Sequence, residues 1–547
     1  MTNLFDRVLP DVLVTRARMT PHRVFLQPVD QPPVTFAETY ARACSVAHGL
    51  LDLDVQRGDC VVIMADSSTD SICTWLGIQL AAAVEVAINT GYRGASLTHA
   101  LQNSRAKVIY VAAALVPRLA EVRGSLTYLE TVVVYDALDL HDDLRIDGLR
   151  VLRFADVLGP DNTHPDRPVH PRDLASVVYT SGTTGPAKGV MMPHGQISLF
   201  ARLGIEGSDM TEDDAHYCFI PLYHVAGKFM ALYASLITGG RVIVDTAFSA
   251  EHWLPRVRQY GATMSHVHGP LVEMIYNQPP TPEDADNEVT RIVASPFPAK
   301  IAHDFERRFG LRGIETWGMT EVTVPVWQPH DRPLQTGCCG FVRDEYFDLR
   351  IVDPDTDEGL PRGQTGEIVL RPRQPWTMMQ GYFRNPEATA EAWRNLWFHT
   401  GDLGFMDDEG RMYFVDRAKE RIRRRAENVS SYDIEAAALS HPHVRECAAV
   451  GVASEFEGDD DILLYVVSAA GAPQDPEALL GHLVKELPHF MVPRYVSYVS
   501  DFPRTPTGKT QKALLRDAGK GTATWDRKAA GVSLRNLASA ANEETPC

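Results

Sequence analysis

The chain of 547 residues lacks the features that mark a membrane or secreted protein. A bilayer-spanning helix needs about 20 consecutive apolar residues, and the most apolar windows, such as "GIQLAAAVEVAI" (77–88) and "MALYASLITGG" (230–240), are too short or too interrupted. The opening stretch "MTNLFDRVLPDVLV" carries two aspartates and has no basic start followed by an apolar core, so it does not resemble a signal peptide. We therefore expect a soluble, cytoplasmic protein.

Cysteine is absent from the arrangements in which it would carry chemistry. None of the eight cysteines forms a C-x-x-C pair, and a chain of this size needs no disulfides to fold, so reduced thiols are expected. The adjacent Cys338 and Cys339 have no nearby set of further ligands, which disfavours a metal site at that place.

An excess of positive charge is missing as well. Lys and Arg number 53 against 71 Asp and Glu, which gives a formal net charge of −18. This balance argues against nucleic acid or an anionic membrane surface as a partner. The run of three arginines at 423–425 is therefore a local feature and not the footprint of a nucleic-acid-binding surface.

Apolar β-rich runs alternate with helical patterns over the first four hundred residues. The segments 59–65, 107–113, 128–136 and 240–245 are predicted buried strands, with helices such as "SLTHALQNS" and "SAEHWLPRVRQYG" between them. Such alternation predicts an α/β architecture with mainly parallel sheets. From about residue 335 the sequence becomes rich in turns and strands, which predicts an additional small β-structure.

A second change of pattern lies near residue 417 and predicts a small α+β domain after it. We expect an N-terminal domain over 1–416, a C-terminal domain over 420–520, and a poorly ordered polar tail over 521–547. A chain of this length is too long for one hydrophobic core, which supports the division. The oligomeric state stays open, and a homodimer is one of the alternatives.

The most informative segment is "VVYTSGTTGPAKGVMMPH" at 177–194. An apolar strand runs into a loop of Thr, Ser and Gly, followed by Lys188; small residues let backbone amides approach a phosphate, and hydroxyls and the ammonium group add donors. The loop is not a Walker A motif, because Lys188 is followed by Gly189 and not by Ser or Thr. An ordinary Gly/Ser/Thr turn is the alternative for this segment taken alone.

Six further motifs follow in a fixed order: "PLYH" (221–224), "TWGMTE" (316–321), "GEIVLR" (366–371), "FHTGDLG" (398–404), "VDRAKERI" (415–422) and "PRTPTGKTQK" (503–512). Together with 179–190 they closely resemble the superfamily of AMP-forming acyl-CoA synthetases, peptide-synthetase adenylation domains and firefly-type luciferases, over roughly residues 10–518. The segments "GYFRNPEATAEAW", "ENVSSYDIEAA" and "HPHVRECAAVGV" look most like small-acid CoA ligases of the crotonobetaine/carnitine–CoA ligase type.

The resemblance implies a two-step reaction and a set of nucleotide contacts. A carboxylate attacks the α-phosphorus of ATP, pyrophosphate leaves, and a thiol captures the acyl-adenylate. Glu321 would help to hold Mg²⁺, Trp317 would offer an aromatic face to adenine, and Thr320 would contact the α-phosphate. The residues that the resemblance assigns to ATP are Thr180, Ser181, Gly182, Thr183, Thr184, Lys188, Trp317, Gly318, Met319, Thr320, Asp402 and Arg417. Packing in the core is the alternative for Trp317.

The resemblance also implies a mobile C-terminal lid. Asp402 would accept the ribose hydroxyls with Arg417 behind it, and Lys509 would reach the α-phosphate and the attacking carboxylate during adenylation. Lys419, in a hinge over 417–419, would let the lid rotate between adenylation and thiol capture. For Lys509 alone, a solvated surface lysine is the alternative. We expect Lys509, Thr184, Glu321 and His224 to be the catalytic residues.

Two positions bear on the acid that is activated. His224 in "PLYH" would border the acyl pocket, either gating it or only packing against it. Lys228, four residues further on, stands where most relatives have a neutral residue. A cation that faced the pocket would suit a small anion or a second carboxylate on the substrate, whereas an outward-facing lysine would carry no meaning for the substrate.

The acceptor face after the hinge departs from the pattern of CoA ligases. Arg425 and Ala426 stand where two glycines are usual, and Arg423, Arg424 and Glu427 flank them. The arginines could grip the phosphates of CoA, narrow its passage, or form a solvated basic surface. We expect ATP, Mg²⁺ and CoA as ligands and an acid–CoA ligase acting on a small or aromatic acid. A carrier-protein thiol, an amine, or nitrite activation for diazotisation of an arylamine are the alternative acceptor chemistries, and a catalytically silent nucleotide-binding protein is the rival of another class.

Overall fold

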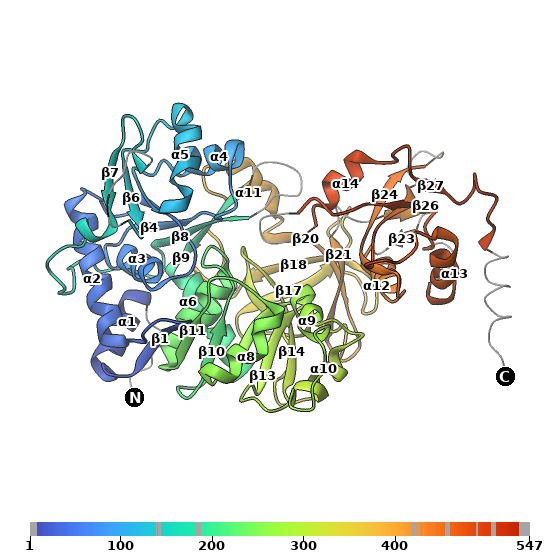
Figure 1. Cartoon of the computed structure of the whole chain (residues 1–547), viewed down its shortest axis with the longest axis horizontal. Helices are drawn as coiled ribbons and strands as arrows, with labels where there is room; N and C mark the ends of the chain where they lie inside the picture. The colour runs from blue at the N-terminus through green and yellow to red at the C-terminus, as the bar shows by residue number, and fades with distance from the viewer. Residues whose placement is uncertain are drawn as a thin grey trace.

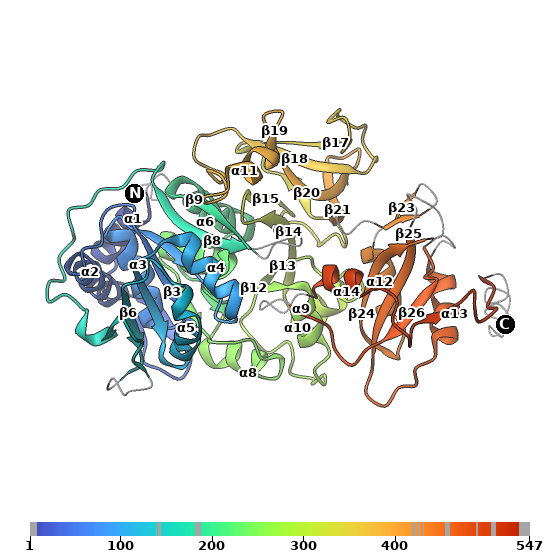
Figure 2. The same ribbon diagram turned by 90° about the horizontal axis from the view of Figure 1, so that it is seen from above.

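The structure is a computed structural model that describes residues 8–137, 139, 144–180, 187–417, 422–424, 427–429, 431–454, 460–487, 491–504 and 510–534. At Arg417, Arg423, Arg424 and Glu427 it describes the backbone only. Two large sheets and their helices form most of the molecule, and a smaller group of elements follows at the C-terminal end (Figures 1 and 2).

The first large sheet has seven strands in the order β7-β6-β5-β3-β4-β8-β9, all parallel except the last pair. Alternate residues of its central strands face opposite sides, and each side is covered by its own helices: α2 and α3 on one, α4 and α5 on the other. The elements are α2 (Phe36–Asp52), β3 (Cys60–Met64), α3 (Thr69–Leu80), β4 (Val84–Ala87), α4 (Gly94–Ser104), β5 (Val108–Ala112), α5 (Val116–Val122), β6 (Thr131–Tyr135), β7 (Arg150–Arg153), β8 (Leu174–Thr180) and β9 (Lys188–Pro193).

The second large sheet has a parallel part that is covered by helices. The strands β14, β13, β12, β10, β11 and β1 are parallel neighbours in that order. The elements are α1 (Leu9–Met19), β1 (Val24–Pro28), β2 (Val34–Thr35), α6 (His194–Ser208), β10 (Ala215–Cys218), η6 (Ala226–Tyr233), α7 (Ala234–Thr238), β11 (Arg241–Val244), α8 (Ala250–Tyr260), β12 (Met264–His268), α9 (Gly269–Tyr276), β13 (Arg291–Ser295), α10 (Ala302–Phe309) and β14 (Arg312–Met319).

The predicted small β-structure is the antiparallel continuation of this second sheet. From β14 onward the neighbours are β15, β16, β21, β20, β18 and β17, each pairing antiparallel with the next. The elements are β15 (Thr323–Trp327), β16 (Gly340–Val342), β17 (Phe347–Val352), β18 (Gly366–Pro372), α11 (Pro386–Ala392), β19 (Trp393–Arg394), β20 (Trp397–Met406) and β21 (Arg411–Arg417). The predicted α/β class with a β-rich part after residue 335 is confirmed.

The C-terminal elements build a sheet of four strands and a short hairpin. The sheet order is β24-β25-β26-β27, and β22 pairs with β23. The elements are β22 (Ile422–Arg424), β23 (Glu427–Val429), α12 (Ser431–Leu439), β24 (Val444–Ala453), β25 (Asp460–Ser468), α13 (Pro476–Glu486), β26 (Tyr495–Tyr498), α14 (Lys512–Ala518) and β27 (Trp525–Asp526). One of their two clusters of buried apolar residues begins at Ile422 and the other at Ala448.

The tail differs from its prediction over 521–534. The strand β27 adds to the sheet edge beside β26, and Asp526 forms an ion pair with the buried Arg494 at 3.1 Å. A short polar tail can order when its backbone completes a sheet edge and its carboxylate pairs with a buried cation. Residues 535–547 lie outside the described residues.

Candidate active site

The hydroxyl-rich motif begins in one strand and ends in its antiparallel partner. The strand β8 ends at Thr180 and β9 begins at Lys188, and these two residues are partners in the antiparallel register. Residues 181–186 connect them, so the predicted positions Ser181, Gly182, Thr183 and Thr184 lie outside the described residues. Gly189 is needed here, because a Cβ atom would lie only 2.7 Å from the side chain of Val177.

Lys188 is connected to Glu321 through a tyrosine. The ammonium group of Lys188 lies over the ring of Tyr382, 4.8 Å from its centre, and the Tyr382 hydroxyl donates a hydrogen bond to Glu321 Oε1 at 3.1 Å. A cation over an aromatic face is held electrostatically by the ring. Three distant segments of the chain thus meet, and Tyr382, which the sequence analysis quoted within "GYFRNPE" but assigned no role, joins them.

The backbone of Thr320 and Glu321 is fixed by the helix that follows β9. The side-chain amide of Gln196 donates to the carbonyl oxygens of Thr320 (2.9 Å) and Glu321 (3.1 Å). Glu321 itself is 5% exposed. Gly318 lies where β14 and β15 approach, because a Cβ atom there would be 2.3 Å from the carbonyl oxygen of Thr323. The "TWGMTE" motif therefore forms a tight connection between β14 and β15, and its backbone is held in place by the surrounding residues.

Trp317 and Asp402 form a second connection between separate motifs. The indole Nε1 donates a hydrogen bond to Asp402 Oδ2 at 3.1 Å, and both side chains are 5% exposed. Asp402 on β20 pairs with Arg417 on β21 in the sheet register, so the two residues predicted to bind the ribose are neighbours across the ladder. Trp317 also packs in the main core, which is the role given above as the alternative to adenine binding.

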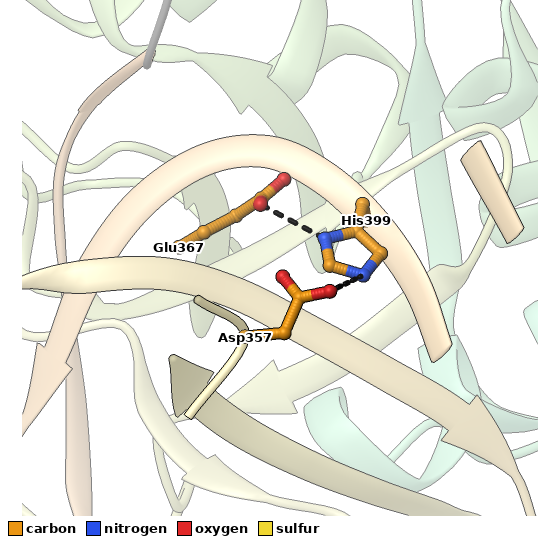
Figure 3. Close-up of side chains that lie close together, drawn as sticks. All are labelled: Asp357, Glu367 and His399. Carbon is orange, nitrogen blue, oxygen red and sulfur yellow. Dashed lines mark hydrogen bonds and ion pairs between the residues drawn. The ribbon is translucent and has the colours of Figure 1, made fainter. Parts of the chain in front are cut away.

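Glu367 holds the stretch of β20 that carries Asp402. Its Oε2 lies 2.9 Å from His399 Nδ1 (Figure 3). The same oxygen lies 3.0 Å from the Arg394 guanidinium, and Oε1 accepts the backbone N–H of Gly401 at 3.0 Å. Asp357 lies on the other side of the His399 ring, with Oδ2 3.8 Å from Nε2. The three side chains are near enough to share a metal ion, but the Arg394 cation already pairs with both carboxylates. We therefore infer that Asp357, Glu367 and His399 hold Asp402 in position and do not bind a metal ion.

A buried carboxylic acid beside the motif was not predicted. Glu315 on β14 is 2% exposed, and its Oε2 has no hydrogen-bond partner among the described residues. Burial raises the pKa of Glu315 to about 8, so the group is protonated at neutral pH. No spacing signal in the sequence distinguishes this glutamate from a surface residue.

His224 and Lys228 lie near each other in sequence and differ in environment. His224 is half-buried, its Nδ1 accepts the backbone N–H of Ala226 at 3.2 Å, and its ring meets that of His268 edge to face at 5.1 Å. Lys228 is 1% exposed, lies on the π-helical segment η6, and pairs with the buried Glu85 of β4.

The environment of Lys228 matches neither position considered in the sequence analysis. Its ammonium neither faces solvent nor offers a free charge to a substrate, because the Glu85 carboxylate already neutralises it. Burial lowers the pKa of Lys228 from its ordinary value, while Glu85 opposes that change.

The remaining predicted positions lie within or after the segment 417–419, which was predicted to be a hinge. Lys419, Arg425, Ala426 and Lys509 lie outside the described residues. The backbone of Arg423, Arg424 and Glu427 forms the short β22–β23 hairpin, with Arg424 and Glu427 paired, so that Arg425 and Ala426 connect the two strands. No helix among the described residues combines the length and the apolar character that a bilayer crossing requires.

Comparison with known proteins finds two matching family models. The family model "AMP-binding enzyme" matches residues 13–383, and "AMP-binding enzyme C-terminal domain" matches residues 433–509. A sulfoacetate–CoA ligase of Cupriavidus necator is 34% identical over 362 residues, which cover 65% of this chain and 69% of that protein. A 4-coumarate–CoA ligase of Narcissus pseudonarcissus is 27% identical over 497 residues, 88% of each chain. A crotonobetaine/carnitine–CoA ligase of Salmonella paratyphi A is 27% identical over 493 residues, 88% of this chain and 92% of that protein.

Solved structures agree in fold. The crystal structure of an anthranilate CoA ligase in complex with anthranoyl-AMP superposes with a TM-score of 0.85 at 23% identity, over 96% of this chain and 99% of that one. An ATP-bound MatB from Rhodopseudomonas palustris gives a TM-score of 0.81 at 24% identity, over 93% and 98%. At these identities the likeness shows the fold alone.

Proposed function

The chain belongs to the family of AMP-binding enzymes and is an AMP-forming ligase, and on this premise we propose that it joins a small or aromatic carboxylic acid to coenzyme A. In the first step a carboxylate oxygen bonds to the α-phosphorus of ATP. The bond between that phosphorus and the oxygen that bridges to the β-phosphate breaks, and pyrophosphate leaves. In the second step the CoA sulfur, having lost its proton, bonds to the acyl carbon, and AMP leaves.

The observation that carries the proposal is the connection of Lys188 to Glu321 through Tyr382. It brings the Lys188 cation and the buried Glu321 carboxylate to the same tyrosine. A cation and a carboxylate are the charges that a triphosphate and its counter-ion require. Catalysis then rests on donors and cations that are already aimed before the reaction begins.

We propose that Glu321 holds Mg²⁺. A carboxylate oxygen is a preferred ligand of this ion, and Glu321 is held in place by Tyr382 and Gln196, so the residues fit the group. The ion would supply positive charge to the phosphate oxygens. Thr180, Ser181, Gly182, Thr183, Thr184 and Thr320 would donate to the phosphates, and Gly318 and Met319 would place Trp317 against adenine.

The lid and acceptor roles are part of the same proposal. Lys509 would close over the site during adenylation, Lys419 would serve the rotation, and Arg423 to Glu427 would then face CoA. The domain limits 1–416, 417–419 and 420–520 follow from this scheme. A cytoplasmic location is proposed as well, since the seven described cysteines are free thiols.

To test this, the protein is incubated with ATP and Mg²⁺ and with each acid of a panel, or with nitrite and an arylamine. Each reaction is run in the presence and in the absence of CoA. AMP, pyrophosphate and the acyl product are measured. We expect sustained release of AMP together with a CoA thioester. Both should appear only when CoA is present in excess over the enzyme. Continuous release of AMP without CoA and without thioester would leave the adenylating step intact and refute CoA as the acceptor.

A further inference from the structure

One face of α4 contacts both ends of the segment 181–186, which connects β8 to β9. Before this segment, the hydroxyl of Tyr179 donates to Asn103 Oδ1 at 2.7 Å. After it, the carbonyl oxygen of Ala187 lies 3.0 Å from His99 Nε2. Residues four apart share one face of a helix, so His99 and Asn103 reach the two ends of the segment side by side. We call His99, Asn103 and Tyr179 the α4 clamp.

The members of the α4 clamp also contact one another. A carbonyl oxygen only accepts, so Nε2 of His99 carries the proton and donates to Ala187. The ring of His99 meets the ring of Tyr179 edge to face, with 6.3 Å between the ring centres. All three side chains of the clamp are half-buried. The clamp is therefore one connected unit of two hydrogen bonds and one ring contact.

A second segment, 381–383, holds the beginning of β9. The backbone N–H of Phe383 donates to the carbonyl oxygen of Gly189 at 2.7 Å, next to Lys188, whose ammonium lies over Tyr382. Phe383 packs against the same apolar cluster as Tyr179 and as Ala187, and this cluster includes the buried residues of α4. The end of β8 and the start of β9 are therefore held by α4 and by the segment 381–383.

The helix α4 is itself a firm support for these contacts. Its residues Leu97, Ala100 and Leu101 are buried against the first large sheet, and Gln102 donates to the Thr127 hydroxyl at 3.1 Å. Backbone amides and hydroxyls that bind a phosphate must converge on it, and ordering them when the ligand binds costs conformational entropy. Fixing both ends of a binding segment beforehand reduces that cost.

We propose that His99, Asn103 and Tyr179 are positioning residues for the β- and γ-phosphates of ATP. They set the separation of the two strand ends between which the phosphate-binding segment runs, and they act through that segment. The inference rests on the proposed function, which assigns the segment to ATP. It adds His99 and Asn103, which belong to none of the motifs and were predicted only to lie in a helix.

Titration calorimetry on the full chain with ATP, pyrophosphate and AMP, each with Mg²⁺, tests the proposal without any acid. Tyr179→Phe and His99→Leu each remove one hydrogen bond of the clamp, so we expect Kd for ATP and for pyrophosphate to rise about threefold to tenfold. AMP has neither a β- nor a γ-phosphate, and its Kd should change less than about twofold. His99→Gln keeps a donor and should retain most of the affinity for ATP.

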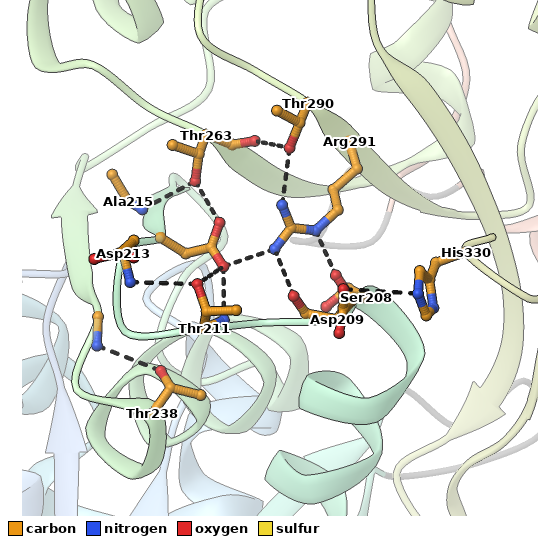
Figure 4. A network of polar contacts seen from close by, with 12 residues as sticks. Ser208, Asp209, Thr211, Asp213, Ala215, Thr238, Thr263, Thr290, Arg291 and His330 are labelled. Atoms are coloured by element: carbon orange, nitrogen blue, oxygen red, sulfur yellow. Dashed lines mark hydrogen bonds and ion pairs between the residues drawn. The ribbon is translucent and has the colours of Figure 1, made fainter.

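Thr263→Val is the matched control, because it removes a hydroxyl that donates to Asp214 Oδ1 at 2.7 Å in a different polar network (Figure 4). That network lies at the amino ends of β10, β12 and β13, whereas the "TWGMTE" motif lies at the carboxyl end of the parallel strand β14. The control should lower the urea midpoint and leave the Kd values for all three ligands unchanged.

Two results would overturn the inference and leave the ligase standing. One is a Kd for ATP that is the same in the wild type, Tyr179→Phe and His99→Leu. The other is an equal loss of affinity for ATP and AMP in both variants, which would show a general disturbance of the site. A wild-type protein that binds neither ATP nor AMP would refute the proposed function first, and the inference would fall with it.

Discussion

The indole nitrogen of Trp317 bonds to Asp402 at 3.1 Å, although 85 residues separate the two in the chain. The aromatic face proposed for adenine and the carboxylate proposed for the ribose are thereby locked to each other. Glu367 also holds the stretch of β20 that carries Asp402, because it accepts the backbone N–H of Gly401. A rigid pair of this kind spares the enzyme the cost of ordering both contacts when ATP binds.

Trp317→Phe keeps an aromatic ring and removes the donor to Asp402. A hydrogen bond to a charged group contributes about 1.5–3 kcal/mol, so we expect kcat/KM for ATP to fall by about 10-fold to 100-fold. The preference for ATP over 2′-deoxy-ATP should decline as well, because Asp402 is no longer held. Steady-state kinetics with both nucleotides measure this. Trp376→Phe is the control, since Trp376 is 44% exposed; equal effects of both substitutions would contradict the pairing role.

Tyr382→Phe removes the hydroxyl that donates to Glu321 and keeps the ring beneath Lys188. We expect the Mg²⁺ concentration for half-maximal rate to rise by about tenfold, because a lost hydrogen bond to a carboxylate leaves Glu321 less ordered. Tyr382→Leu also removes the cation–π contact and should raise the KM for ATP further. Titration of Mg²⁺ at saturating ATP is the measurement, with the exposed Tyr128→Phe as control. An unchanged Mg²⁺ requirement in Tyr382→Phe would exclude the supporting role.

Lys228→Met should destabilise the protein strongly. It leaves Glu85 buried without its partner, which costs about 3–5 kcal/mol in comparable sites. Adding Glu85→Gln should recover much of that loss, since no buried charge then remains unpaired. Urea unfolding of both single variants and the double variant measures the coupling.

The exposed pair of Lys107 and Glu130, at 3.7 Å, is the matched control. Lys107→Met should cost less than about 1 kcal/mol. If the double variant were no more stable than Lys228→Met, the ion pair would not explain the burial of Lys228.

Acid should weaken the fold through its buried neutral histidines. Burial lowers the pKa of His194 to about 4 and that of His216 to about 3, both below the unfolded value of about 6.5. The unfolded chain therefore binds more protons below pH 6.5, and each histidine contributes stability that is present above pH 6.5 and lost progressively as the pH falls. Between pH 7 and pH 5 the loss is about 2 kcal/mol per histidine.

His216→Gln should reduce the loss of unfolding free energy between pH 7 and pH 5 by the contribution of one histidine, about 2 kcal/mol. The measurement is the urea midpoint at pH 5, 6 and 7 for the wild type and the variant. His303→Leu is the control, because His303 is exposed on α10. A wild-type protein that is equally stable at pH 5 and pH 7 would show that these rings are protonated in the folded state.

The sequence predicted the elements better than the contacts between them. The apolar runs at 59–65 and 107–113 correspond to β3 and β5, because an uninterrupted apolar run fits a parallel strand that is buried on both faces. The change of pattern at 335 was visible because antiparallel strands alternate with turns. Order at 521–534 was missed because β27 has only two residues, and what holds it is a partner strand and Arg494.

Candidate site residues could be named from the sequence where a motif carries them, but contacts that only the fold creates could not. Asp402 and Arg417 follow from their motifs, and the sheet register makes them neighbours. The pairing of Lys228 with Glu85 spans 143 residues and joins η6 to β4 of the first large sheet, so no local spacing in the sequence indicates it. The same holds for the stacked rings of His216 and His266, which come from two strands that are 50 residues apart in sequence.

The central claim is that an acyl-adenylate forms at this site before any thiol takes part. Exchange of labelled pyrophosphate into ATP tests it most directly, because the exchange needs the first step and its reversal only. The account predicts exchange that depends on Mg²⁺ and on an acid and that proceeds without CoA. Absence of exchange with every acid in the panel, or exchange that begins only when CoA is added, would contradict it.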